Sequence, residues 1–333
     1  MTRARSIRLA ACAAALCVAA SLSVARAGVL TQDPCPGTAT GPAVWATFGT
    51  ANVLENLLFA DGSLWVSDSG GSRVVRLSPD AEELGSLDGL SPGGLAEGPD
   101  GLIYAGSGNS IPDALQRTGE SKVVRFDPSD PAGTLQTYAA GFNMANGMTF
   151  GPGDDLYVSN DVDRGLIRIP REEPSSWHLL ADVWGTNGLV VDPAGENLYA
   201  AITFDQRSPI ERIPLAAPDA HETAAVLTLG ALSLEPALYA PDVSKPILGV
   251  KGLDDMTRSH DGTLYVVANG LGELLRVDPL TGEACLVASG LQNPASVRIA
   301  PAGSPFDTSG EALTFYVVEF SGAVRTVGYT PAS

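Results

Sequence analysis

The residues most able to do chemistry are oxygen-bearing side chains that recur at one position of a repeated sequence unit. They are two carboxylates and two amides: Glu55, Asn146, Asn187 and Asp254. Carboxylate and amide oxygens are hard ligands that Ca2+ prefers, whereas zinc and copper sites are usually built with His or Cys, which this position lacks. The sequence therefore predicts one divalent-cation site, with Ca2+ as the preferred ion and Mg2+, Mn2+ or Zn2+ as other possibilities.

Some of these residues also admit a simpler interpretation. Asn146-Gly147 and Asn187-Gly188 are Asn-Gly pairs, the dipeptide most typical of tight hairpin turns. Glu55 shares the position although Glu is a poor turn residue, which favours the cation site. Asp255 directly follows Asp254, and neighbouring residues of a strand point to opposite sides. Asp255 could therefore act as a base beside the site or be a solvated turn residue.

These residues recur because the chain contains six similar units, each with a short apolar strand, a turn rich in Asp, Pro or Gly, and an apolar-aromatic strand. Most units continue with a third strand and a polar segment able to form a fourth. The units span 54–80, 93–128, 145–170, 186–214, 253–279 and 294–327. This pattern predicts an all-β fold, a six-bladed β-propeller with four antiparallel strands per blade. Because the innermost strands of a propeller surround a channel, the recurring oxygen side chains are expected to meet at one of its ends.

A strand from the N-terminal end of the repeated region is expected to complete the sixth unit at its C-terminal end. The sixth unit ends without a fourth strand, and Ala43–Gly49 can supply it, which closes the ring and removes an exposed edge. We therefore place the propeller at residues 43–333, after an N-terminal segment, 28–42. Cys35 lies in that segment and Cys285 in the outer strand of the fifth unit, so a disulfide between them would fasten the closure. Two free buried thiols are the alternative.

The N-terminus and the composition restrict the compartment and the partners. Residues 1–8 are basic, residues 9–24 are an uncharged apolar run, and Ala25-Arg26-Ala27 supplies small residues for a signal peptidase. Residues 1–27 are thus predicted to be a secretory signal cleaved after Ala27. We expect a secreted or periplasmic monomer with no later membrane span. A net charge of −18 repels phosphate backbones, which argues against a nucleic-acid partner.

Two long connections are candidates for the substrate pocket. Residues 106–121 interrupt the second unit between its second and third strands, and residues 230–252 join the fourth unit to the fifth. In an up-and-down blade, both connections lie on the face where the first strand starts, beside the expected cation. Asn109 and Arg117 of the first connection are the candidate substrate contacts, although each connection could equally be a neutral insertion.

The chain resembles the six-bladed propellers of the gluconolactonase, senescence-marker-protein and luciferin-regenerating-enzyme family, and more distantly the paraoxonases and strictosidine-synthase relatives. The resemblance covers about residues 40–330 and rests on Asn146-Gly147-Met148, Asn187-Gly188-Leu189 and Asp254-Asp255-Met256 with the strand motifs around them. It implies one catalytic divalent cation, with ligands that map to Glu55, Asn146, Asn187 and Asp254.

The resemblance also implies an activity, the hydrolysis of a small-molecule lactone or related ester. The cation would polarise the carbonyl as a Lewis acid while Asp254 takes a proton, with Asp255 as the local alternative base. The inner strand of the second unit contains Ser91-Pro92-Gly93-Gly94 and lacks the polar Asn or Arg of the sugar-lactone members. A more apolar lactone or ester is therefore as compatible with the sequence as a sugar lactone.

Two other functions are compatible with the sequence. In the first, the propeller is not an enzyme: a structural Ca2+ stiffens the channel and the loops bind a partner. In the second, the protein is a lyase or condensing enzyme similar to strictosidine synthase, which would need a Glu base in the pocket. Nothing in the sequence places a Glu there, and the residues considered for this role are Glu211, Glu235 and Glu273.

Overall fold

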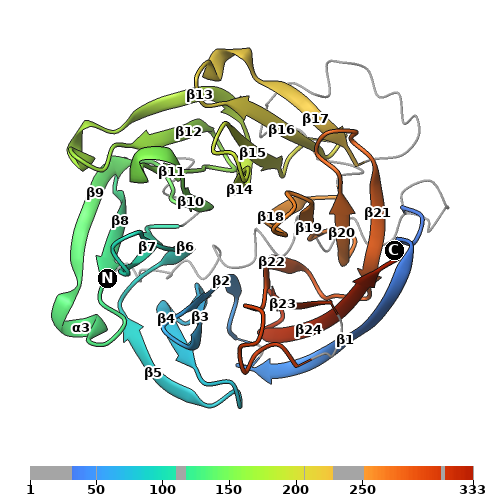
Figure 1. The fold of residues 1–333 in the computed structure, drawn as a ribbon. Helices are drawn as coiled ribbons and strands as arrows, with labels where there is room; N and C mark the ends of the chain where they lie inside the picture. Colours follow the sequence, from blue (N-terminus) through green and yellow to red (C-terminus); the bar gives the residue numbers. More distant parts are fainter. Residues whose placement is uncertain are drawn as a thin grey trace, which may run out of the picture.

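The architecture of the chain is seen in a computed structural model that describes residues 32–49, 51–109, 118–205, 207–227, 251–308 and 312–332. Six four-stranded sheets form a ring, so the predicted six-bladed β-propeller is confirmed (Figure 1). The predicted signal peptide, Arg117 and most of residues 230–252 lie outside the described residues. Within the described ranges, no helix is both long enough and apolar enough to cross a membrane.

Each blade is an antiparallel sheet whose first strand lies innermost in the ring (Figure 1). Blades 1 to 3 consist of β2 (Leu54–Ala60), β3 (Ser63–Asp68), β4 (Arg73–Leu77) and β5 (Glu83–Asp88); β6 (Pro92–Glu97), β7 (Ile103–Ser107), β8 (Ser121–Phe126) and β9 (Gln136–Phe142); and β10 (Met148–Phe150), β11 (Leu156–Val158), β12 (Arg164–Ile169) and β13 (His178–Trp184). Blades 4 and 5 consist of β14 (Thr186–Val191), β15 (Asn197–Ile202), β16 (Pro209–Pro214) and β17 (Glu222–Val226); and β18 (Leu253–Arg258), β19 (Leu264–Ala268), β20 (Glu273–Val277) and β21 (Ala284–Ser289). A single helical turn, α3 (Pro131–Thr134), connects β8 to β9.

Blade 6 takes three strands from the end of the chain, β22 (Pro294–Ile299), β23 (Leu313–Glu319) and β24 (Ala323–Pro331), and its fourth from the N-terminal side. That strand, β1 (Gly37–Thr47), pairs antiparallel with β24, as predicted for the closure. It begins at Gly37 rather than at Ala43, so the propeller starts earlier than the predicted boundary. Most of the added residues are exposed, and Gly37 to Thr40 pair with β24 through backbone hydrogen bonds rather than through apolar side chains, which the sequence pattern does not reveal.

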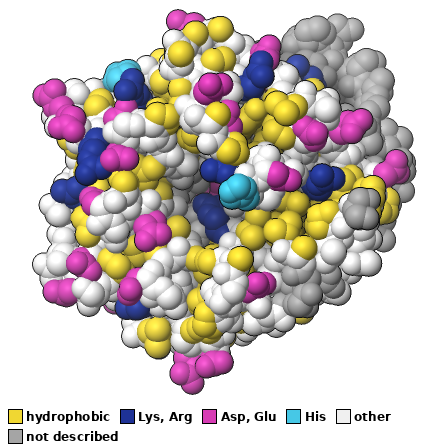
Figure 2. Space-filling model, in the orientation of Figure 1, with side chains coloured by type: hydrophobic (Ala, Val, Ile, Leu, Met, Phe, Trp, Pro, Cys, Tyr) yellow, Lys and Arg dark blue, Asp and Glu magenta, His cyan; other side chains and the backbone are white. Residues whose placement is uncertain are grey.

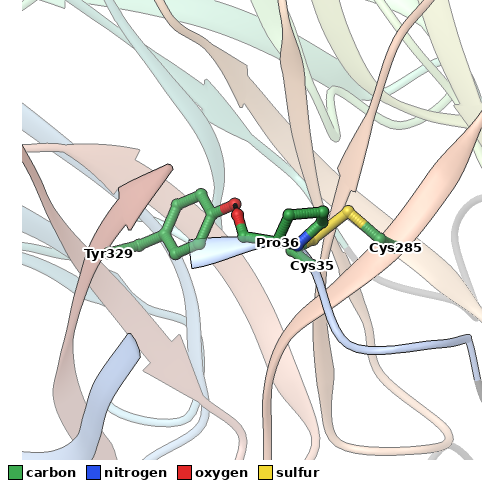
Figure 3. The surroundings of a disulfide bond; sticks show 4 residues. All are labelled: Cys35, Pro36, Cys285 and Tyr329. Carbon is green, nitrogen blue, oxygen red and sulfur yellow. Dashed lines mark hydrogen bonds between the residues drawn. A yellow bond between two sulfur atoms is a disulfide. The ribbon is translucent and has the colours of Figure 1, made fainter. Parts of the chain in front are cut away.

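A disulfide fastens this closure to the neighbouring blade (Figure 3). Cys35 is bonded to Cys285 of β21, with a Cα–Cα distance of 4.8 Å. The backbone N–H of Cys35 donates to the carbonyl oxygen of Leu286 at 2.8 Å, and the hydroxyl of Tyr329 in β24 donates to the Pro36 carbonyl oxygen at 2.9 Å. The residues before β1 are therefore attached to blade 5 as well as to blade 6, and such a bond is compatible with an oxidising compartment.

The blades pack through an aromatic position that recurs on their second strands. These rings are at most 3% exposed: Trp65, Tyr104, Tyr157, Tyr199 and Tyr265. Each faces an arginine on the third strand of its own blade, in order Arg76, Arg125, Arg168, Arg212 and Arg276. The Arg76 guanidinium lies 5.4 Å from the centre of the Trp65 ring, a cation–π geometry. These aromatic residues therefore build the blades and are not free to stack on a ligand.

Candidate cation site in the channel

The four oxygen side chains that were predicted to share a site lie at the starts of the inner strands. Glu55, Asn187 and Asp254 are the second residues of β2, β14 and β18, and Asn146 lies just before β10. Asn187 and Glu55 both lie close enough to the Asp254 carboxylate to affect its pKa. The structure thus brings residues of blades 1, 4 and 5 together at one end of the inner strands.

Glycines let the inner strands approach one another closely at this end. A Cβ on Gly94 would lie 2.2 Å from the carbonyl oxygen of Asn146, and a Cβ on Gly147 would lie 2.3 Å from the carbonyl oxygen of Asn187. A Cβ on Gly188 would lie 2.6 Å from the Cα atom of Asp255, in the inner strand of blade 5. The glycine of each Asn-Gly pair admits the neighbouring blade, a use that only a residue without Cβ allows. The hairpin-turn interpretation of Asn187-Gly188 is wrong, because both residues lie within β14.

The two carboxylates lie in surroundings that disfavour their charged form. Asp254 is buried, and this burial, followed by the charges of Glu55 and Asp161, raises its pKa well above the ordinary value. Burial and the charge of Asp161 also raise the pKa of Glu55 to about 8, and a hydrogen bond from Asn109 opposes that rise. A cation bound among such carboxylates would offset both their repulsion and the cost of their desolvation.

Asp161 is a third carboxylate of this group, and the repeats did not predict it. It lies in the connection between β11 and β12, where burial raises its pKa to about 6 while its own backbone N–H and the Asn146 side chain donate to it. Its Oδ1 atom is buried without a hydrogen-bond partner, and so is Oδ1 of Asn109. An unsatisfied buried oxygen costs free energy. Both atoms would gain a partner from a bound cation or its water ligands.

The polar residues that follow the second strands form a second set around the site. The structure places Asn109, one of the two predicted substrate contacts, in this set through its hydrogen bond to Glu55, whereas Arg117 is outside the described residues. The sequence pattern that identifies Asp161 appears when the repeats are aligned at the ends of their second strands. It does not appear when they are aligned at the starts of their first strands. The members of the set are Asn109, Asp161, Thr203 and Asn269.

Thr203 determines which atom of the Asn187 amide is left for a ligand. The Thr203 hydroxyl donates its proton to the carbonyl oxygen of Leu253 at 2.8 Å, so towards Asn187 it can only accept. The Asn187 Nδ2 atom lies 3.1 Å away and is the donor. The nitrogen of Asn187 is therefore committed to Thr203, and its carbonyl oxygen is the atom able to bind a cation.

Asp255 does not offer a free carboxylate beside the site. Its Oδ2 atom accepts hydrogen bonds from Asn56 at 2.9 Å, from Ser296 at 2.5 Å and from Arg298 at 2.6 Å. Its Oδ1 atom accepts from the backbone N–H of Met256 at 2.8 Å. Both oxygens of the Asp255 carboxylate are therefore occupied by donors from the chain itself.

The chemistry of the donor set fits a hard divalent cation. In the part of the chain that the structure describes, no three His, Cys, Asp or Glu side chains are close enough to hold a metal by themselves. The amide oxygens and water would therefore have to complete the coordination. Ca2+ accepts such a mixture, because it takes six to eight oxygen ligands from carboxylates, amides and water.

Comparisons with known proteins support the fold. No protein-family model and no curated protein matches the chain. A gluconolactonase from Xanthomonas campestris has a similar structure, with 14% identity and a TM-score of 0.62 over 92% of this chain and 99% of that one. Regucalcin, a calcium-binding protein from Agrobacterium tumefaciens, has 14% identity and a TM-score of 0.62 over 91% of this chain and 97% of that one.

A third similar structure has a different activity. Virginiamycin B lyase from Staphylococcus aureus, in a catalytically inactive form with quinupristin, has 13% identity and a TM-score of 0.54 over 85% of this chain and 97% of that one. At these identities the comparisons establish the shared propeller fold and leave the activity to be argued from the site. The gluconolactonase and regucalcin structures nevertheless belong to the family that the sequence resembles.

Proposed function

We propose that the channel site binds one divalent cation, Ca2+ in preference to others, and that the protein hydrolyses a lactone or a related ester. The observation that carries the proposal is the group formed by the buried Asp254 and the half-buried Glu55 and Asp161, whose carboxylates repel one another and include an oxygen without a partner. A cation would stabilise such a group. The structural similarity to a gluconolactonase and to a calcium-binding protein supports the reaction class and the choice of ion.

The proposed ligands divide into charged and neutral oxygens. Glu55 and Asp254 supply carboxylates, Asn146 and Asn187 supply amide carbonyl oxygens, and Asp161 adds its negative charge nearby. When bound, the cation would polarise the substrate carbonyl and stabilise the negative charge that develops on its oxygen. The side chains of this chain then have two tasks, which are to hold the substrate carbonyl at the site and to accept a proton from the attacking water.

Asp254 is the proposed proton acceptor. Unlike Asp255, which is ion-paired with Arg298, Asp254 has no ion-pair partner among the described residues, so its carboxylate is open to a proton from the attacking water. Asn187 and Asn269 orient its carboxylate, the latter from 3.4 Å. We assign no proton transfer to Asp255, the alternative base suggested by the sequence, because its oxygens are occupied by Asn56, Ser296 and Arg298.

Blade 2 favours a substrate with few polar groups. Its inner strand β6 begins with Pro92, Gly93 and Gly94, so no polar side chain projects there. Asn109 is the polar group nearby, with its Nδ2 atom 3.0 Å from the position that a Cβ of Gly93 would take. We therefore extend the proposal to a small, largely apolar lactone or ester. The disulfide and the predicted signal peptide support a secreted or periplasmic location.

The Glu bases that a lyase mechanism would require are engaged elsewhere. Glu273, in the third strand of blade 5, accepts a hydrogen bond from the buried Lys251 at 2.8 Å. Glu211, in the third strand of blade 4, accepts one from the Thr223 hydroxyl at 2.7 Å. Glu235 lies outside the described residues. This placement favours the hydrolase over the lyase.

The decisive experiment removes and restores the cation. The protein is treated with chelator, refilled with Ca2+, Mg2+, Mn2+ or Zn2+, and assayed on sugar and aliphatic lactones beside an Asp254→Asn variant. We expect turnover that Ca2+ restores and that the variant lacks while its fold is retained. A Ca2+-induced rise in Tm without turnover on any lactone would instead support the non-catalytic propeller that binds a partner.

A further inference from the structure

The residues that follow two of the proposed carboxylate ligands are hydrogen-bonded to each other. Asn56 follows Glu55, Asp255 follows Asp254, and Nδ2 of Asn56 donates to Oδ2 of Asp255 at 2.9 Å. These residues belong to blades 1 and 5, which are separated in the ring by blade 6 (Figure 1). The bond therefore directly connects the two inner strands that carry Glu55 and Asp254, across a blade that lies between them.

Blade 6 contributes an arginine guanidinium and a serine hydroxyl that complete this connection. Nη1 of Arg298 donates to Asp255 Oδ2 at 2.6 Å, and its Nη2 donates to Asn56 Oδ1 at 3.3 Å. The Ser296 hydroxyl also donates to Asp255 Oδ2, at 2.5 Å. Asn56, Asp255 and Ser296 are at most 4% exposed. We call these four residues the floor cluster: Asn56, Asp255, Ser296 and Arg298.

The side chains of the floor cluster are hydrogen-bonded to one another, and their charges nearly cancel. Asn56 is held on both sides of its amide, because its Oδ1 also accepts the backbone N–H of Leu95 from blade 2 at 3.3 Å while its Nδ2 donates to Asp255. The Arg298 guanidinium balances the charge of Asp255. Figure 2 shows Lys or Arg side chains in the hollow at the centre of the ring. The cluster therefore joins four blades without offering a competing ligand.

We propose that the floor cluster positions Glu55 and Asp254, and that it thereby sets the affinity of the site for Ca2+ and its selectivity over Mg2+. This inference rests on the proposed cation site. Ca2+ binds oxygen at 2.3–2.6 Å and tolerates irregular geometry, whereas Mg2+ requires a near-octahedral set at 2.0–2.1 Å. A small shift between the strands of blades 1 and 5 therefore changes the two affinities unequally. Substitution of residues that orient ligands typically weakens metal binding 10–100-fold.

The test compares Asn56→Ala with a matched variant, Asn197→Ala. Asn197 donates its side-chain N–H to Asp192 at 2.7 Å in blade 4, an amide–carboxylate bond of the same kind at the start of a second strand. Calorimetric titration of the metal-free proteins gives the Kd for Ca2+ and for Mg2+, Tb3+ luminescence gives an independent readout of occupancy, and Tm reports stability. For Asn56→Ala we expect Ca2+ binding about 10–100-fold weaker and a lower ratio of Ca2+ to Mg2+ affinity. Asn197→Ala should lower Tm and leave both affinities unchanged.

A conservative substitution separates positioning from simple loss of folding. Arg298→Lys keeps a positive charge near Asp255 but loses the second N–H group that reaches Asn56, so we expect a Kd between those of the wild type and Asn56→Ala. Equal Ca2+ affinity in the wild type and Asn56→Ala would overturn the inference, as would an equal loss in Asn197→Ala. A wild-type protein that binds neither ion would overturn both the proposed function and this inference. A wild-type protein that binds Ca2+ no more tightly than Asn56→Ala would overturn this inference alone.

Discussion

Replacement of both Cys35 and Cys285 by Ser is expected to destabilise the propeller mainly by releasing a constraint on its unfolded chain. The disulfide joins residues 250 apart, and loop-closure entropy then gives a stabilisation of about 5.5 kcal/mol at 25 °C. With an unfolding entropy of about 2.1 cal/mol/K per residue over roughly 300 residues, this free energy corresponds to a fall in Tm of about 9 °C. The backbone hydrogen bond between Cys35 and Leu286 does not involve the sulfur atoms, so the native closure should survive.

Equilibrium urea unfolding followed by circular dichroism measures this loss. Wild-type protein kept in reductant is the control and should unfold with the double variant, because both lack the bond without other changes to the fold. Oxidised wild type and double variant that differ by less than about 1 kcal/mol would contradict the loop-closure reasoning. The pairing of β1 with β24 would then account for the stability of the closure without help from the disulfide.

Three further predictions concern the site. Asp254→Asn should lower kcat by about 100-fold or more, because it removes the proposed proton acceptor, with Tm unchanged or raised; a kcat near that of the wild type would exclude the role. Asp161→Asn should weaken Ca2+ binding, measured by calorimetry, and raise the Tm of the metal-free protein, since one repelling carboxylate is lost. Burial raises the pKa of Glu55 to about 8, so the folded state binds this proton more tightly than the unfolded state does. The Tm of the metal-free protein should therefore fall as pH rises from about 4.5 to about 8, and saturating Ca2+ should abolish that fall; a Tm that rises over this range would contradict the reasoning.

The fold was predictable because each blade repeats its own local pattern. The period of apolar strands and turns identified six units, and the missing strand of the sixth identified the closure. The start of β1 was not predictable, since Gly37 to Gly41 are exposed and Gly37 to Thr40 pair with β24 through their backbone. Residues that bury no apolar face leave no periodic signal.

The candidate site was predictable only in the part that shares one strand position. Glu55, Asn146, Asn187 and Asp254 lie at equivalent starts of inner strands, so alignment of the repeats placed them together. Asp161 lies after a second strand, outside that alignment. The environment of Asp255 depends on Asn56, which is 199 residues away. Such a partner is set by the ring as a whole, so a single sequence does not reveal whether the carboxylate is a free base or an engaged one.

The composite sixth blade has a consequence for biosynthesis. Pro36, immediately before β1, and Tyr329 of β24 are 293 residues apart, so at about 5–20 residues per second the ribosome needs roughly 15–60 s between making the two strands. Throughout that interval β1 has an unpaired edge and the ring cannot close. A second nascent copy that supplies its own β24 first would produce an intertwined pair. The time for which the edge of β1 remains unpaired would therefore affect the yield of closed single rings. A chaperone or the rate of translation could control that time.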